Sequence, residues 1–113
     1  SGFFLRRYAS VIHLDASVLL PLLDKNGVVV PKEQASALRN FRYNLIRGRI
    51  KTRVKVSLIA LGEVLRKLIE KGHPELIEEM KQLSSKMGDR LELGYLPDSE
   101  MPTMTFMECC KGS

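Results

Sequence analysis

The chain has 113 residues, of which 44% are hydrophobic and 27% are charged, so it has the length of a single domain and enough apolar residues for one core. This composition is that of an ordinary globular protein, and no apolar run approaches the roughly 18 residues needed to cross a bilayer. We therefore expect neither a disordered nor a transmembrane chain. The first residues also lack the long apolar region of a secretory signal, so we expect a cytoplasmic protein.

The charge is unevenly distributed along the chain. The net charge is +5, but residues 1–55 carry 11 Lys/Arg against 3 Asp/Glu, whereas residues 56–113 carry 7 against 10. A basic half favours a polyanionic partner such as RNA, although ribosomal, membrane-surface and nuclease proteins all share this property. Charge alone therefore indicates the class of partner only weakly.

The two cysteines, Cys109 and Cys110, are adjacent. A disulfide between neighbours requires a strained ring, and no histidine lies near them in the sequence to complete a zinc site. We therefore expect two reduced thiols, as is usual in an intracellular protein.

The first half of the chain predicts one strand followed by two helices. Residues 10–14 are mostly apolar and β-branched, which is typical of a strand buried on both faces. Asp15 then precedes a short apolar helix that contains Pro21, a residue that only the first helical turn tolerates, and that ends before Gly27. From residue 31 to about 47, apolar residues recur at helical spacing, which indicates an amphipathic helix that Gly48 can end.

The second half repeats the pattern. Residues 54–57 predict a second strand, after which leucines recur at helical spacing between an N-cap at Ser57 and a stop at Gly72. Pro74 suits the first position of another helix, which Gly88 closes, and residues 91–96 alternate as a third strand does. Helices that separate single strands indicate parallel βαβ units. We therefore expect one α/β domain with a three-layer α/β/α arrangement around a central, mainly parallel sheet.

Two carboxylates are candidates for a metal site. Asp15 directly follows the first predicted strand, where open α/β sheets bind ligands, although Asp at this position also commonly caps the following helix. Glu63 has apolar neighbours in the sequence, and it either binds a cation, pairs with Arg66 or Lys67, or is solvated at the surface. Together, two strand-to-helix units each bring one carboxylate to the same edge of the sheet, which would assemble a Mg²⁺ or Mn²⁺ site.

The segments that carry these two acids, residues 11–20 and 56–65, resemble those of the PIN-domain family of metal-dependent ribonucleases. The resemblance covers about residues 9–96. It implies that Asp15 and Glu63 are catalytic, metal-binding residues, and that Ser17 matches the small polar residue two positions after the first aspartate. Ser17 has the alternative of a capping or buried hydroxyl. In the family, such residues and two further acids hold one or two divalent cations that activate water for attack on an RNA phosphodiester.

The resemblance is incomplete at the far end of the chain. The remaining acids of the family would come from a segment beyond residue 113, so the chain resembles a PIN domain without its C-terminal part. Asp98, Glu100 and Glu108 are expected at the surface and are not predicted ligands. His13 shares strand parity with Asp15, so a His-x-Asp metal pair is geometrically allowed, but a core histidine with satisfied nitrogens is the simpler interpretation.

The most densely charged stretch, residues 39–55, contains seven basic and no acidic residues: Arg39, Arg42, Arg47, Arg49, Lys51, Arg53 and Lys55. Basic groups neutralise phosphates, and the interleaved Tyr43 could stack on an unpaired base. We predict RNA binding by four of these residues, Arg42, Arg47, Arg49 and Arg53. The alternative is a solvated helix face leading into a basic loop, with Phe41 in the core.

The preferred interpretation is a PIN-like endoribonuclease domain that requires Mg²⁺ or Mn²⁺ and binds RNA but no membrane. The main alternative is a non-catalytic RNA-binding or assembly module with the same fold. A third is an interaction module whose exposed apolar surface is covered by a partner or a second copy. Dimers are common in the PIN family, so the resemblance also allows a homodimer.

Overall fold

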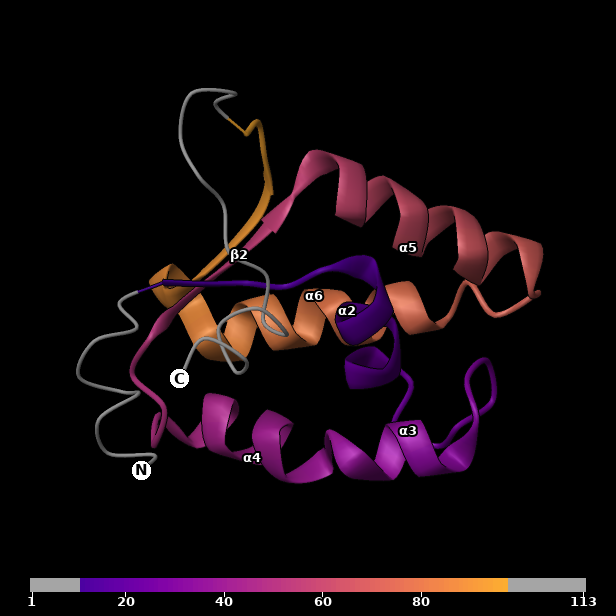
Figure 1. Ribbon diagram of the computed structural model, residues 1–113, viewed down its shortest axis with the longest axis horizontal. Helices are drawn as coiled ribbons and strands as arrows, with labels where there is room; N and C mark the ends of the chain where they lie inside the picture. The colour runs from indigo at the N-terminus through magenta and orange to yellow at the C-terminus, as the bar shows by residue number, and fades with distance from the viewer. Residues whose placement is uncertain (1–10, 98–113) are drawn as a thin grey trace.

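The computed structural model describes residues 11–97. Its elements in chain order are β1 (Val11–His13), α2 (Ala16–Leu23), α3 (Lys32–Ala37), α4 (Arg39–Arg47), β2 (Arg53–Ser57), α5 (Leu58–Glu70), α6 (Leu76–Met87), a 3₁₀ turn (Gly88–Arg90) and β3 (Leu91–Tyr95) (Figure 1). The strands pair in the order β1-β2-β3, and both pairings are parallel. The expected α/β class with a parallel sheet is therefore confirmed.

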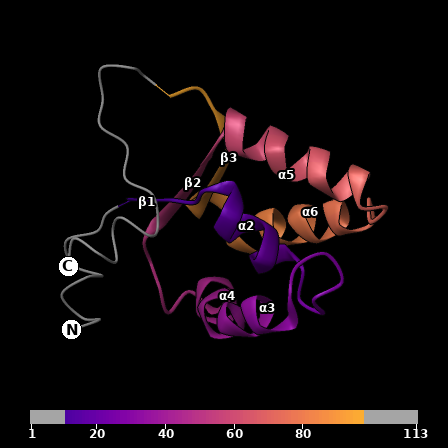
Figure 2. The same cartoon turned by 45° about the vertical axis from the view of Figure 1, so that its right-hand side comes forward.

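The described helices lie on one side of the sheet (Figures 1 and 2). Helix α2 packs against α3, α5 and α6, and α4 packs against α6. The strand order explains this arrangement, because both crossovers move across the sheet in the same direction and right-handed connections then place their helices on the same face. Within residues 11–97 we find no helix on the other face of the sheet, which the expected three-layer arrangement would require.

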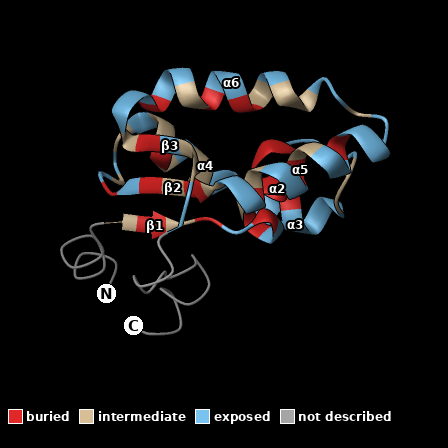
Figure 3. Ribbon diagram, turned by 90° about the horizontal axis from the view of Figure 1, so that it is seen from above, coloured by how far each residue is buried: buried red, intermediate tan, exposed pale blue. Residues whose placement is uncertain are grey.

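Strand residues alternate between the two faces as this layering requires. Ile12, Val54 and Val56 are buried beneath the helices, whereas Arg53 and Lys55 point to the face that the described helices leave open. The helices contribute the rest of the core, with the largest fully buried apolar side chains at Leu19, Leu22, Leu23, Leu45, Leu68 and Leu83 (Figure 3). Seven of the eight residues of α2 are buried, so this helix forms the centre of the domain.

Pro21 lies inside α2 and not in its first turn, which differs from the sequence prediction. Proline removes the hydrogen bond that residue 21 would donate to the carbonyl of Ser17. Helix α2 therefore continues through Pro21 with one backbone hydrogen bond fewer.

Two helix boundaries also differ from prediction. The helix expected over residues 31–47 is divided at Leu38, which has φ −97° and ψ −1° and links α3 to α4. Helix α6 begins at Leu76 rather than Pro74, because residues 73–75 form a turn in which the Leu76 N–H donates to the His73 carbonyl. Gly48 ends α4 as predicted, in the left-handed conformation at φ 75° that favours glycine.

Several predictions concern residues that the structure does not describe. Cys109, Cys110, Asp98, Glu100 and Glu108 all lie outside residues 11–97. Within that range, no helix has both the length and the apolar character that a membrane span requires.

Candidate functional site

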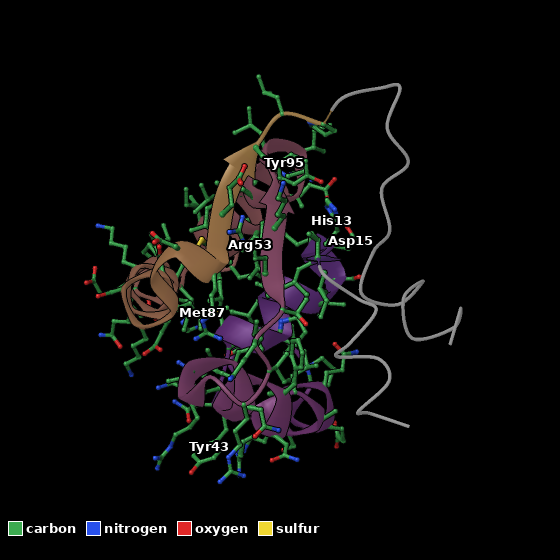
Figure 4. The ribbon with its side chains drawn as sticks, turned by 90° about the vertical axis from the view of Figure 1, so that its left-hand side faces the viewer. His13, Asp15, Tyr43, Arg53, Met87 and Tyr95 are labelled. Carbon is green, nitrogen blue, oxygen red and sulfur yellow. The ribbon has the colours of Figure 1, made fainter. Side chains whose placement is uncertain are left out.

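Asp15 lies at the carboxyl end of β1 and caps α2 (Figure 4). One oxygen, Oδ1, accepts the Ala16 N–H at 2.8 Å, and the Ser17 hydroxyl donates to Oδ2 at 3.3 Å. The capping interpretation of Asp15 is therefore confirmed. The side chain is nevertheless exposed, and each carboxylate oxygen has lone pairs that these bonds do not use, so capping and metal binding are compatible.

Ser57 repeats this arrangement at the end of β2, where its hydroxyl accepts the Ala60 N–H at 3.1 Å and caps α5. This bond was predicted from the sequence, and it fixes the start of the helix that carries Glu63. We expect Ser57→Ala to lower the free energy of unfolding by about 1 kcal/mol, because an N–H in the first turn loses its acceptor. Urea unfolding measures this loss, and Ser57→Asn is expected to restore most of it, since Asn also caps helices well.

Glu63 is exposed on α5, on the flank of the helix that faces away from α6. It precedes the buried Val64, whereas Leu65 follows Val64 and lines a groove with Ile77 and Met80 of α6. Residues on either side of a buried position lie on opposite flanks of a helix, so Glu63 is on the flank away from α6. Among the described residues Glu63 forms no ion pair with Arg66 or Lys67, and Arg66 pairs instead with Glu70 at 3.8 Å, so the exposure of Glu63 fits the solvated alternative.

Asp15 and Glu63 therefore belong to neighbouring strand-to-helix units whose helices, α2 and α5, pack against each other. The described part of the chain contains no group of three or more His, Cys, Asp or Glu side chains that could hold a metal ion. Asp15 and Glu63 are both exposed.

His13 contacts Tyr95 rather than forming a pair with Asp15. Its Nδ1 is hydrogen-bonded to the Tyr95 hydroxyl at 2.5 Å, and the Lys55 ammonium lies 5.6 Å from the centre of the Tyr95 ring. Burial and the nearby Lys55 charge lower the pKa of His13 below its ordinary value of 6.5. Burial and the Glu92 carboxylate raise the pKa of Tyr95. His13 is half-buried on the open face of the sheet, not in the core as the simpler interpretation expected.

The four arginines predicted to bind RNA have different environments. Arg47, Arg49 and Arg53 are exposed, and the Arg47 guanidinium lies 5.0 Å from the centre of the Tyr43 ring. The Arg42 side chain is only 12% exposed and pairs with Glu79 of α6 at 3.0 Å. Arg42 is therefore not part of the exposed basic surface, because its guanidinium links α4 to α6. Phe41 is partly buried against the core.

Comparisons with protein-family models, with curated proteins and with solved structures each gave no significant match for this chain. The function is accordingly inferred from the chemistry and placement of the residues described above.

Proposed function

We propose that this chain is a PIN-like endoribonuclease domain in which Asp15 and Glu63 bind Mg²⁺ or Mn²⁺. The observation that supports this function best is the pairing of two adjacent, parallel strand-to-helix units, each of which carries one exposed carboxylate. Crevices at the carboxyl ends of parallel strands are the usual ligand sites of open α/β sheets.

The two side chains are chemically suited to a hard divalent cation. Mg²⁺ prefers oxygen ligands, keeps several of its waters, and is commonly held by one or two carboxylates. The Ser17 hydroxyl and the Ala16 N–H orient the Asp15 carboxylate and leave part of it free. When bound, the cation would lower the pKa of a coordinated water and offset the charge that accumulates on the RNA phosphate.

The test is incubation of labelled single-stranded RNA with the whole chain, in Mn²⁺ and in a chelator. Cleavage that occurs in Mn²⁺ and stops in the chelator would support the proposal. Intact RNA under both conditions, with the folded protein present in excess, would exclude a nuclease function for this chain.

RNA binding without cleavage is the second candidate function, and the exposed aromatic and basic groups of α4 favour it. Tyr43 is 45% exposed with Arg47 beside its ring, and Arg53 is exposed at the start of β2. Such groups can contact phosphates and stack on unpaired bases without any metal.

We expect the double substitution of Arg47 and Arg53 by Gln to weaken binding of single-stranded RNA and to reduce its salt dependence. Each phosphate contact contributes about 0.7 to the slope of log affinity against log salt for single strands, so the slope should fall by about 1.4. Fluorescence anisotropy at several salt concentrations measures both effects. Lys86→Gln, which removes an exposed charge from α6, is the control, and an equal effect there would contradict a defined basic surface.

A further inference from the structure

A concave site lies between α2, α3 and α4. It is a pocket of about 390 Å³ whose apolar lining includes Leu22, Leu38 and Ile46. Tyr43, which Figure 4 shows well away from His13 and Asp15, contributes an aromatic ring. This volume lies within the range of pockets that bind small molecules. We refer to it as the α2–α4 pocket.

The polar part of the α2–α4 pocket is cationic. Lys25, Arg39 and Arg42 all line it, and a single carboxylate, that of Glu79, pairs with both Lys25 at 3.3 Å and Arg42 at 3.0 Å. Arg39 forms no ion pair or hydrogen bond with any residue of the described range. The pocket therefore has an excess of positive charge over the one acid that neutralises part of it.

Arg42 also has an unused hydrogen-bond donor. Its Nη2 donates to Glu79, but its buried Nε–H has no acceptor within residues 11–97. A buried donor on a cation without an acceptor is unfavourable, so an anionic oxygen that reached this position would be bound strongly. Because the Nε atom is covered in the free protein, that contact requires a rotation of neighbouring side chains, which is common on binding.

We propose that the α2–α4 pocket binds one nucleotide, with the phosphate at Arg39 and Arg42 and the base against the apolar lining and Tyr43. Guanidinium groups suit phosphate because their planar donors match its oxygens. A planar base suits the apolar walls and the aromatic ring. The nucleotide is either free or one unit of a single-stranded RNA, and the chemistry is the same in both cases. This site does not depend on the metal centre.

The experiment is a titration of the ¹⁵N-labelled chain with AMP, in a chelator, followed by NMR. Adenosine and inorganic phosphate are titrated separately. We expect AMP to shift the amide signals of pocket residues in α3 and α4, and to bind more tightly than either of its parts. Absence of shifts with millimolar AMP, or shifts confined to residues outside the pocket, would overturn the proposal.

Arg39→Gln is the decisive variant, because Arg39 is exposed and can be replaced without disturbing the core. Loss of one charged phosphate contact is expected to weaken AMP binding about tenfold while leaving adenosine binding unchanged. The matched control is Lys51→Gln, which removes the same charge from an exposed position that does not line the pocket. Equal weakening of AMP binding in both variants would mean that only the net charge of the protein attracts the phosphate. That result would contradict a specific phosphate contact in the pocket.

The source of the nucleotide is distinguished by competition. If a short single-stranded RNA displaces AMP from the pocket, the natural ligand is a unit of RNA, and if it does not, the ligand is a free nucleotide. Both outcomes support the proposal that the α2–α4 pocket binds a nucleotide. Because no metal is present, a failure of AMP to bind would leave the proposed nuclease centre unaffected, and a failure of metal binding would leave this site unaffected.

Discussion

Asp24→Asn is expected to lower the free energy of unfolding by about 3 kcal/mol, because it removes an acceptor from a buried network. Asp24 is fully buried, and its carboxylate accepts three backbone hydrogen bonds, from Val28 at 2.9 Å and from Val29 and Val30 at 2.8 Å each. An amide has one acceptor oxygen, and its NH₂ group would face donors. At least one N–H of the loop after α2 would therefore lose its partner.

The hydrogen bonds to the Asp24 carboxylate also make the free energy of unfolding depend on pH. Burial alone would raise the pKa of Asp24, but the three backbone donors outweigh it, with a smaller contribution from His73, and the pKa lies below its ordinary value of 3.8. The stabilisation from the ionised carboxylate is therefore complete above pH 3.8 and is lost as the pH falls from there through the folded pKa. We expect the difference in unfolding free energy between the wild type and Asp24→Asn to shrink over that acidic range.

Urea unfolding of both proteins at neutral and acidic pH measures these two effects. The control is Asp89→Asn, because Asp89 is exposed in the turn before β3 and its replacement should change stability by less than about 0.5 kcal/mol. If the free energy of unfolding of Asp24→Asn equals that of the wild type at neutral pH, the Asp24 carboxylate does not stabilise the loop after α2.

The burial of Asp24 illustrates what the sequence did not predict. Hydrophobic periodicity correctly located three strands and the main helices, because those patterns depend on neighbours three or four residues apart. Asp24 stands just before Asn26 and Gly27, so locally it looks like part of a polar turn. Its burial depends on how residues 28–30 fold back over the end of α2, which no local pattern encodes.

Arg90 is a second example of a long-range contact that sequence reasoning missed. Its guanidinium donates to the carbonyls of Leu45 at 2.7 Å and Ile50 at 2.9 Å, which ties the end of α4 to the start of β3. These partners are 40 or more residues distant in the chain. The environment of Arg42 was missed for the same reason, since its partner Glu79 lies on another helix. The capping residues Asp15 and Ser57, by contrast, were predictable, because their partners are local.

Asp15→Asn is the substitution with the largest expected effect on the proposed activity. Removal of one of two anionic oxygen ligands should abolish Mn²⁺ binding and RNA cleavage together, since the cation prefers charged carboxylates. Stability should change little, because Asn caps helices about as well as Asp and can still accept the Ala16 N–H. Calorimetric titration with Mn²⁺, followed by RNA incubation in the same sample, measures both properties. A mutant that binds Mn²⁺ as the wild type does would exclude Asp15 as a ligand.

Glu63→Gln provides the second arm of this experiment, with Glu70→Gln as its matched control. Both acids are exposed on α5, but Glu63 lies in the half of the helix that follows β2, whereas Glu70 is its last residue and pairs with Arg66. Loss of Mn²⁺ binding in Glu63→Gln but not in Glu70→Gln would establish that the two strand-to-helix units share one cation. If Mn²⁺ binding is unchanged in Glu63→Gln and Glu70→Gln but lost in Asp15→Asn, the cation is held by Asp15 without Glu63. If RNA affinity survives in all three variants while no cation binds to the wild type, the chain is an RNA-binding module, because the exposed basic groups of α4 and β2 need no metal to contact phosphate.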